Sequence, residues 1–262
     1  MKVFDAHVHV YPEKIAEKAT LSTGDYYGID MYSIGTEERI LEEIKAGKIT
    51  KCLIHSTATK PEQVEKINDY IAGLKNDHEE FVGFGTMHPD YPDIKGEIQR
   101  MIDLGLLGIK IHSDFQGFAL DSESAFKIYE AARGKLPILF HVGDAKSDLS
   151  HPKKLRAVHN AFPDLQIIAA HLGGYSKWDD AEKYVIGTGM YVDISSCLSF
   201  ISKERAKRMI INHGTDKVLF GSDFPMHDPL VNLKLFLDLG FSDEDNEKIL
   251  YKNAEKLLGI KI

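Results

Sequence analysis

The sequence predicts a (β/α)₈ barrel, an α/β fold of the TIM-barrel type, on three observations. Short apolar runs alternate eight times with amphipathic segments along the chain. The apolar runs are rich in Ile, Leu and Val on both faces, which is typical of parallel strands covered by helices. The length of 262 residues is close to that of one such barrel. We therefore expect residues 1–262 to form a single barrel domain.

Each predicted strand is followed by a predicted helix. The strands are expected at residues 3–10, 50–56, 81–87, 106–112, 137–141, 166–171, 190–195 and 217–222. The helices are expected at residues 37–46, 61–78, 93–104, 122–133, 152–162, 179–186, 203–212 and 229–239, with a final amphipathic segment at 243–258. Pro61 in a first helical turn, and Gly105 and Gly134 after helix ends, agree with these boundaries.

The stretch at residues 11–35 interrupts this alternation, because it has no clear period. It follows the first strand and carries Tyr26, Tyr27, Met31 and Tyr32. In a barrel it would lie over the mouth, so we expect an irregular lid or substrate loop. An open, doubly wound sheet is the alternative fold. It would need a glycine-rich phosphate loop after an early strand, and no such motif occurs.

Composition and charge argue against several classes of protein. The hydrophobic content of 43% and charged content of 27% are ordinary for a soluble globular protein. The net charge of -8 is spread over mixed acidic and basic residues, so neither a nucleic-acid nor a membrane partner is expected. Cys52 and Cys197 have no metal-binding spacing. We expect a cytoplasmic protein without a signal peptide, a small-molecule substrate, and a homodimer as the default assembly.

Histidines recur at the carboxyl ends of the predicted strands. Barrel enzymes build their active sites at this face. In chain order, the strand-end residues are His9, His55, His88, His112, His141, His171 and, after the eighth strand, Asp223. Histidines scattered over the surface would not fall repeatedly at strand ends, so this face is the expected site.

The first strand carries two histidines on one face. Side chains two residues apart on a strand point the same way, so His7 and His9 can both reach one ion. Asp5 lies on the same face one layer below and is expected to orient a ligand or to pair with Lys110. The intervening side chains are expected to face the helix layer; they are Phe4, Ala6 and Val8. A catalytic divalent ion uses nitrogen and oxygen ligands and keeps one position open for water. His141 and Asp223 can supply a third imidazole and a carboxylate.

Four short motifs, in order along the chain, carry a family resemblance. They are Asp-Ala-His-Val-His at 5–9, Phe-His-Val-Gly at 140–143, Ala-His-Leu-Gly-Gly at 170–174 and Gly-Ser-Asp-Phe-Pro at 221–225. Together they resemble the amidohydrolase superfamily, and the branch that looks closest includes aminocarboxymuconate semialdehyde decarboxylase. The resemblance spans essentially the whole chain. It implies a distorted barrel, usually with zinc, and either hydrolysis or nonoxidative decarboxylation.

The resemblance also implies roles by motif position. His7, His9 and His141 match imidazole ligands, and Asp223 matches the carboxylate ligand. His171 matches a histidine that acts on the substrate or on water in single-metal members, with a ligand role as the alternative. We therefore expect one divalent ion, zinc foremost, with manganese, iron and cobalt as alternatives.

Four further residues are expected to contact the substrate. Lys110 should pair with a substrate carboxylate or with Asp5; in two-metal members of the superfamily a lysine on this strand is carbamylated and bridges the ions. His55, His88 and His112 should line the pocket, and the alternative is that they cap strand ends by bonding backbone carbonyls.

The leading functional hypothesis is hydrolysis of an amide, lactone or ester bond by metal-activated water. Asp223 would act as the catalytic base, and His171 would polarise the scissile carbonyl or hold the hydroxide. Nonoxidative decarboxylation of an aromatic or unsaturated acid is the alternative, and a ligand-binding barrel without catalysis is the third hypothesis. Ser195 and Ser196 lie in no G-x-S-x-G elbow, so a serine hydrolase is not expected.

Overall fold

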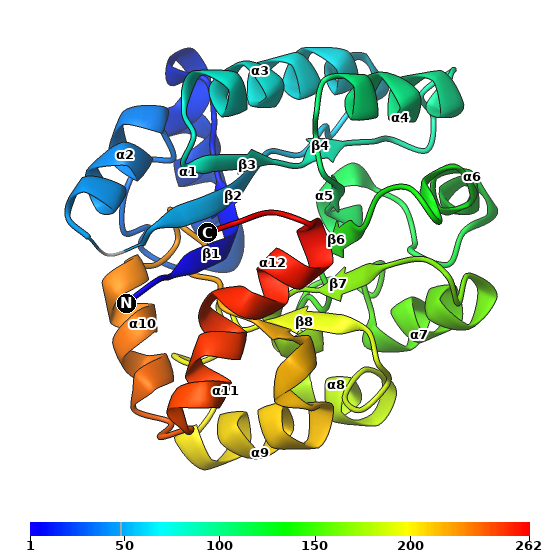
Figure 1. Ribbon diagram of the computed structural model, residues 1–262. Coiled ribbons are helices and arrows are strands. Elements are labelled where there is room, and N and C mark those ends of the chain that lie inside the picture. Colours follow the sequence, from blue (N-terminus) through cyan, green and yellow to red (C-terminus); the bar gives the residue numbers. More distant parts are fainter. Residues whose placement is uncertain (48) are drawn as a thin grey trace.

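Parallel strand segments run around a barrel in this computed structural model, which describes residues 1–47 and 49–262 (Figure 1). Neighbouring strands pair in parallel within two runs, β1 to β3 and β4 to β9. The strands are β1 (Phe4–His9), β2 (Lys51–His55), β3 (Phe81–Gly83), β4 (Gly85–Thr86), β5 (Ile109–Ile111), β6 (Ile138–Phe140), β7 (Ile167–Ala169), β8 (Tyr191–Asp193) and β9 (Val218–Leu219). β3 and β4 are two pieces of the strand predicted at 81–87, parted at Phe84.

The barrel closes because β1 also bonds to the segment that follows β9. The Ala6 amide donates to the Phe220 carbonyl at 2.8 Å. The Asp223 amide donates to the His7 carbonyl at 3.0 Å. The predicted (β/α)₈ barrel is therefore confirmed, and its closure places Asp223 directly beside the first strand.

Helices surround the strands on the outside (Figure 1). They are α2 (Glu37–Lys45), α3 (Val64–Asp77), α4 (Ile94–Asp103), α6 (Glu123–Ala132), α7 (Pro152–Ala161), α8 (Trp178–Tyr184), α9 (Lys203–His213) and α10 (Pro229–Leu237). Thr36, Ser122 and Ser202 begin three of them with side-chain oxygens that accept backbone N–H bonds. The predicted final segment consists of α11 (Asp243–Glu247), the π-helical η4 (Lys248–Lys252) and α12 (Asn253–Leu258). A short helix that was not predicted, α5 (Ser113–Gln116), follows β5.

Side chains that face the barrel axis form an apolar lower layer and a polar upper layer. The lower layer includes Phe4, Leu53, Leu139, Ile168 and Leu219, which pack in one cluster with Ala254 of α12. Figure 1 shows α12 lying across this end of the barrel. The upper layer consists of buried polar residues that include His7, His55, Lys110, His141 and Asp193. The apolar layer thus separates the polar groups from solvent below, and they open only toward the carboxyl ends of the strands.

An irregularity in β1 changes which of its side chains point inward. The pairing of β1 with β2 shifts between Asp5 and Val8. Such a bulge interrupts the alternation of faces. Phe4 and Ala6 consequently join the interior cluster, so the prediction that they face the helix layer is wrong, whereas Val8 packs on the helix side as predicted. The Asp5 carboxylate accepts a hydrogen bond from the Ser222 amide at 2.9 Å and so ties β1 to the last strand.

The segment predicted as an irregular loop at 11–35 contains a helix, α1 (Glu13–Tyr27). The expected absence of regular structure is therefore wrong. Its buried positions are Ala16, Thr20 and Gly24, which follow helical spacing but are small. Because no large apolar side chain marks this stripe, the sequence carries no strong hydrophobic period. The helix does line the cavity at the mouth, as expected for a lid.

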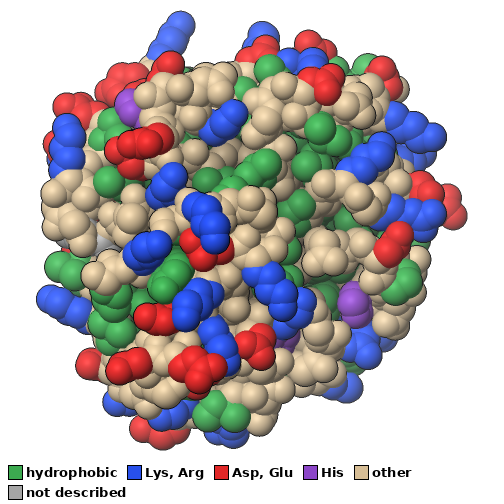
Figure 2. Space-filling view, viewed as in Figure 1, with side chains coloured by type: hydrophobic (Ala, Val, Ile, Leu, Met, Phe, Trp, Pro, Cys, Tyr) green, Lys and Arg blue, Asp and Glu red, His purple; other side chains and the backbone are tan. Residues whose placement is uncertain are grey.

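The outer surface carries charges of both signs. Basic and acidic side chains lie intermixed over the face shown in Figure 2. No helix among the described residues combines the length and the apolar character needed to cross a bilayer. The expected lack of nucleic-acid and membrane partners stays a prediction.

The surroundings of Gly143 and Gly117 predict that alanine substitutions at these two positions differ in their effect on the free energy of unfolding. Gly143 has φ +84°, and an added Cβ would lie 2.5–2.7 Å from backbone atoms of Gly174 and Tyr175. Gly117 has a similar φ of +78°, but nothing lies within 4 Å of an added Cβ. We expect Gly117→Ala to lower the free energy of unfolding by about 1 kcal/mol through backbone strain alone. Gly143→Ala should lower it by more than about 3 kcal/mol because of the added clash. Equal losses in urea unfolding would contradict this account.

Candidate metal and substrate site

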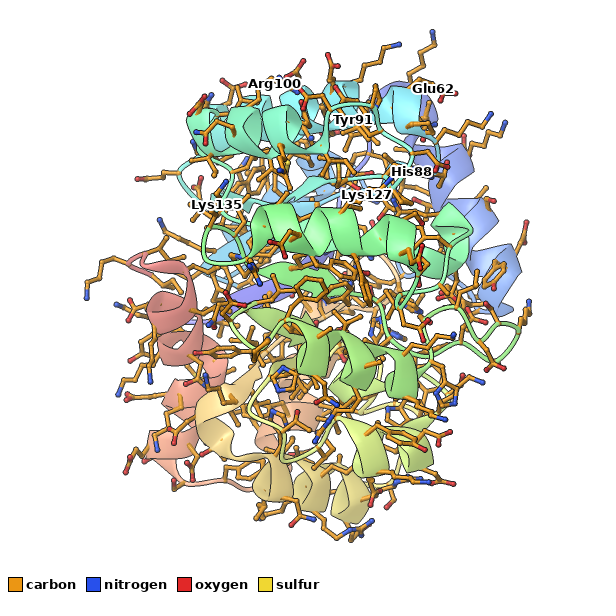
Figure 3. All side chains as sticks on the ribbon, turned by 90° about the vertical axis from the view of Figure 1, so that its right-hand side faces the viewer. Glu62, His88, Tyr91, Arg100, Lys127 and Lys135 are labelled. Carbon is orange, nitrogen blue, oxygen red and sulfur yellow. The ribbon has the colours of Figure 1, made fainter. Side chains whose placement is uncertain are left out.

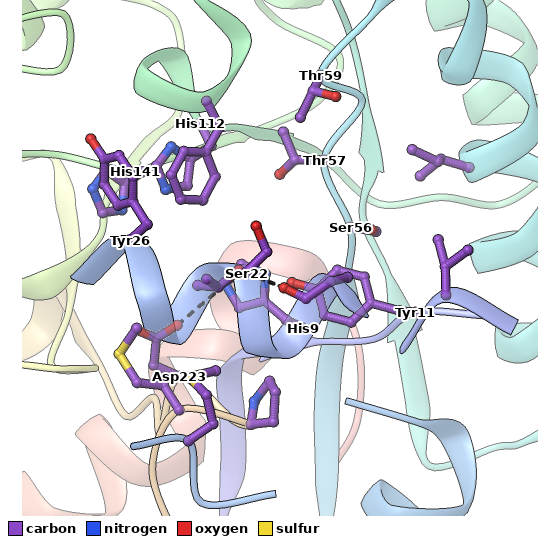
Figure 4. Close-up of a pocket in the computed structure, with 18 of the residues that line it drawn as sticks. His9, Tyr11, Ser22, Tyr26, Ser56, Thr57, Thr59, His112, His141 and Asp223 are labelled. Carbon is purple, nitrogen blue, oxygen red and sulfur yellow. Dashed lines mark hydrogen bonds and ion pairs between the residues drawn. The ribbon is translucent and has the colours of Figure 1, made fainter. Parts of the chain in front are cut away.

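Three predicted ligands meet at the junction of the first and last strands. Asp223 Oδ1 lies 3.2 Å from His9 Nε2 and 3.4 Å from His7 Nε2. Asp223 has φ +66°, an uncommon conformation for a residue with a side chain. Its other oxygen accepts a bond from the Ser196 hydroxyl at 2.5 Å. These contacts fix the carboxylate between two imidazoles. Asp223 and His9 both line the cavity (Figure 4).

Asp193, at the end of β8, is a site residue that sequence reasoning missed. It is fully buried, and Oδ2 lies 2.9 Å from His7 Nδ1. Its Oδ1 accepts bonds from the Ser195 hydroxyl at 2.5 Å and from the His171 amide at 3.1 Å. Burial would raise the pKa of this carboxyl, but the interactions with His7, His171 and Ser195 hold it at about 2. The sequence held one signal for Asp193: it lies two residues before Ser195 on a predicted strand, so the two side chains share the inward face.

The predicted ligand His141 lies in a different set of contacts. His141 Nδ1 is 2.9 Å from His171 Nε2, and its Nε2 is 3.4 Å from the Tyr27 hydroxyl. The same hydroxyl is 3.2 Å from His112 Nε2. The His112 ring stacks between His141 and Phe115, at 3.9 Å from each. His141 is therefore close to His171, His112 and Tyr27, and its assignment as a ligand stays a prediction.

The residues predicted to contact substrate occupy distinct places. His112 lines the cavity, as expected. Lys110 is fully buried below it, with Nζ 3.0 Å from His7 Nε2, so its contact is with a predicted ligand. His55 is buried beside His7 and His9, at ring distances of 4.9 and 4.5 Å.

His88 lies apart from this group. It sits on the loop after β4, where its carbonyl accepts a bond from the Tyr91 amide and its ring accepts one from the Asp90 amide (Figure 3). Its ring is 6.3 Å from that of Phe118. It is not among the described residues that line the main cavity. The His88 ring accepts from a backbone amide rather than bonding a carbonyl, so the alternative that it caps a strand end through a carbonyl stays a prediction.

The main cavity has a volume of about 720 Å³ and opens over the histidines (Figure 4). Aromatic side chains form much of its wall: Tyr11, Tyr26, Tyr27, Phe115 and Tyr175. The end of α1 is fixed over the opening, because the Tyr26 hydroxyl donates to Asp144 Oδ2 at 3.1 Å. Among the described wall residues, Lys66 is the only cation, and it is exposed. Such a wall suits a small, largely uncharged or ring-containing molecule.

Burial sets the charge state of the site. It lowers the pKa of His7 to about 4, assisted by Lys110, so the imidazole is neutral at pH 7. It likewise lowers the pKa of His55 well below the ordinary value. Burial alone would raise the pKa of Asp223, but His7 and His9 outweigh it and keep this carboxyl ionised. Neutral imidazoles beside a carboxylate are the donor forms that bind a divalent metal.

Three groups of side chains in the described part of the chain bring possible metal ligands together. In the group of His7, His171 and Asp193, the Ser195 hydroxyl already lies 2.5–3.2 Å from all three side chains. This group is therefore satisfied by hydrogen bonds.

The remaining groups differ in ring geometry. In the group of His112, Asp114 and His141, the two rings are stacked at an interplanar angle of 7°. Parallel rings direct their lone pairs along parallel lines rather than to one point. The third group is His7, His9 and His55, and it lies against Asp223. Its imidazoles and the adjoining carboxylate fit a divalent ion best.

The chain matches the amidohydrolase family model over residues 4–260. The chain belongs to the amidohydrolase family. The prediction of an enzyme from this superfamily of metal-dependent hydrolases and decarboxylases is thereby confirmed, while its reaction is not fixed. No curated protein matches the sequence.

Solved structures share the fold of this family member. An uncharacterized TIM-barrel protein from Bordetella bronchiseptica is 17% identical, with a TM-score of 0.77 and 99% of each chain covered. A dihydroxybenzoic acid decarboxylase from a Polaromonas species, with bound manganese and 2-nitroresorcinol, is 15% identical, with a TM-score of 0.74 and coverage of 98% of this chain and 97% of the other. A probable 2-pyrone-4,6-dicarboxylic acid hydrolase from Acinetobacter baumannii, with citric acid bound, is 14% identical, with a TM-score of 0.71 and coverage of 99% and 100%. At these identities the likeness shows the fold alone.

The contact between Asp193 and His7 yields a prediction about metal affinity. Asp193→Asn removes the charge that orients the His7 ring, so Zn²⁺ affinity should fall about 10- to 100-fold. Competition with a chromophoric chelator measures this change. Asp148→Asn is the matched control, since Asp148 is 76% exposed and pairs only with Lys177 among the described ion pairs. Unchanged affinity in Asp193→Asn would show that this carboxylate does not support the site.

Proposed function

We propose that this amidohydrolase family member is a metal-dependent hydrolase that opens an amide, lactone or ester bond in a small molecule. The observation that carries the proposal is the Asp223 carboxylate. It faces the cavity and lies within 3.4 Å of both first-strand imidazoles. An ionised carboxylate beside a metal site can accept a proton from an attacking water.

His7, His9 and Asp223 would hold the ion, with His141 as the fourth proposed ligand, and we propose that the ion is zinc. When bound, the ion supplies Lewis acidity that makes water nucleophilic near neutral pH and polarises a carbonyl. Asp223 takes the proton from the water and delivers it to the leaving group. His171 lines the cavity, and its Nδ1 lies 2.9 Å from the Ser195 hydroxyl. To orient a substrate carbonyl, its Nε2 would have to carry a proton and leave His141.

The cavity wall supports a ring-containing substrate. Tyr27 and Tyr175 meet edge to face at 5.3 Å, and Phe115 continues the same wall. Aromatic rings of this kind pack well against a planar molecule. The volume of about 720 Å³ is that of a small-molecule pocket.

Nonoxidative decarboxylation of an aromatic acid is a second candidate, favoured by the same aromatic wall. The similar Polaromonas structure is that of a dihydroxybenzoic acid decarboxylase. Reaction in ¹⁸O-labelled water separates the two candidates. Hydrolysis places the label in a product, whereas decarboxylation releases carbon dioxide without incorporating it into the organic product.

The state of Lys110 bears on the number of ions. Burial lowers its pKa to about 8, so part of the amine is neutral near pH 7.5. A neutral amine can react with carbon dioxide to form a carbamate. We propose a free lysine and one ion; two equivalents of metal per chain would instead assign a bridging carbamate to Lys110. A cytoplasmic location and a homodimer stay predictions.

The proposed function predicts a defined loss on metal removal and on mutation. Protein purified without chelator should carry about one zinc, and chelation should abolish turnover until Zn²⁺ is restored. Asp223→Asn should lower kcat by at least about 100-fold on any substrate found in an amide, lactone and ester panel. Metal content of the variant must be measured alongside, because Asp223 is also a proposed ligand. Full activity in Asp223→Asn, or turnover that persists in metal-free protein, would refute the mechanism.

A further inference from the structure

The main cavity follows one face of α1 for most of the length of that helix. Ile15, Ala19, Ser22 and Tyr26 all line it (Figure 4). Their spacing of three or four residues places them on a single helix face. At a rise of about 1.5 Å per residue, the stretch from Ile15 to Tyr26 measures about 16 Å. The histidines His112 and His141 are contacted only from the far end of this stretch, by the Tyr27 hydroxyl. The cavity is therefore elongated, and it continues past these histidines toward the start of α1.

Helix α3 supplies a second wall for this continuation. Ile67 and Tyr70 of α3 line the same cavity as Ile15 and Ala19 of α1. Burial raises the pKa of Tyr70 to about 12, with a smaller contribution from the carboxylate of Glu13. Because Glu13 is the first residue of α1, Tyr70 lies near the start of that helix. We call the part of the cavity lined by these four side chains of α1 and α3 the apolar arm.

The polar side chains that precede the arm residues along the chain are paired or hydrated. Gln63 Oε1 accepts a bond from the Thr59 hydroxyl at 3.1 Å and another from the Thr59 amide at 2.9 Å. Lys66 is exposed to solvent. The arm itself presents carbon surface, and Ile15 is 50% exposed. Apolar surface of this kind is stabilised when an apolar group removes it from water.

The size of the cavity also favours an occupant longer than one ring. Pockets for drug-sized ligands have volumes of about 300–1,000 Å³, and this cavity has about 720 Å³. A single ring bound over the histidines would leave the apolar arm to water. A molecule that carries a chain on its carbonyl or ring would cover both parts of the wall.

We propose that the substrate is an amide, lactone or ester with a straight apolar chain, which lies along the first half of α1 and leaves between α1 and α3. The inference rests on the proposed function, because it names the substrate class of the same site. The arm takes no part in bond cleavage. Its residues, Ile15, Ala19, Ile67 and Tyr70, determine specificity by contact with the chain.

The test measures the binding of straight-chain hydroxamic acids to zinc-loaded enzyme by titration calorimetry. The hydroxamate group chelates the metal, so acetohydroxamate, butanohydroxamate and octanohydroxamate differ only in the chain that extends from the site. Each CH₂ that enters the arm should tighten binding about two- to fourfold. The heat-capacity change of binding should become more negative along the series, as it does when apolar surface is buried.

A pair of tryptophan variants on α1 locates the chain. Ala19→Trp places a large ring in the arm, so octanohydroxamate should bind at least about 10-fold more weakly while acetohydroxamate binds as in wild type. Leu21→Trp is the matched control, because Leu21 lies on the same helix, is 52% exposed and is not among the described residues that line the cavity. Ala19→Phe is the second variant if Ala19→Trp misfolds, and circular dichroism identifies such a defect.

The outcomes separate this inference from the proposed function. Equal affinity for short and long hydroxamates in wild type, or undiminished octanohydroxamate binding in Ala19→Trp, would overturn the arm and leave the hydrolase proposal standing. Failure of every hydroxamate to bind would count against the metal site instead. The arm is then tested in metal-free protein with 1-octanol by saturation-transfer NMR. A signal in wild type and Leu21→Trp that is lost in Ala19→Trp would support the arm, and no signal in wild type would overturn it.

Discussion

The buried carboxylate of Asp193 fixes the ring orientation of His7 directly and that of His171 through Ser195. An ionised carboxylate only accepts hydrogen bonds, so His7 must present Nδ1–H to it and Ser195 must present its hydroxyl proton. The Ser195 oxygen then accepts from His171 Nδ1–H at 2.9 Å, which leaves the lone pair of His171 on Nε2. Hydrogen positions follow here from the bonding network. Asp193 thus determines which nitrogen of each ring is free to face the site.

The chain of hydrogen bonds that begins at Asp193 continues through His171 to residues of the cavity wall. His171 Nε2 accepts from His141 Nδ1–H at 2.9 Å, so the lone pair of His141 lies on Nε2, toward the Tyr27 hydroxyl. A substitution at Asp193 would therefore alter a chain of side chains that ends on α1. The apolar lower layer of the barrel strengthens these bonds, because it keeps water away from the groups that make them.

The sequence predicted those features that follow from strand periodicity. It located the strands, their shared mouth, and the placement of His7, His9 and Asp223 near one another. It could not predict the bulge that turns Phe4 inward, because the shift depends on pairing with a strand over 40 residues away. It missed α1 because the buried stripe of that helix consists of small residues. Asp193 was overlooked because a single aspartate on a strand forms no motif. Its place on the inward face could nevertheless have been deduced from the alternation of side chains along the strand.

Lys110 and a bound ion would compete for the same atom. The lone pair of His7 faces away from Asp193, on Nε2, and Lys110 Nζ donates to that nitrogen at 3.0 Å. One lone pair holds either a proton donor or a metal. An ion at His7 therefore requires Lys110 to withdraw, to lose its proton or to become carbamylated. Because the lysine is buried in the same polar layer as Asp193 and Asp223, its positive charge replaces part of the cationic charge that the ion would bring. The metal count is thus physically linked to the chemical state of this one amine.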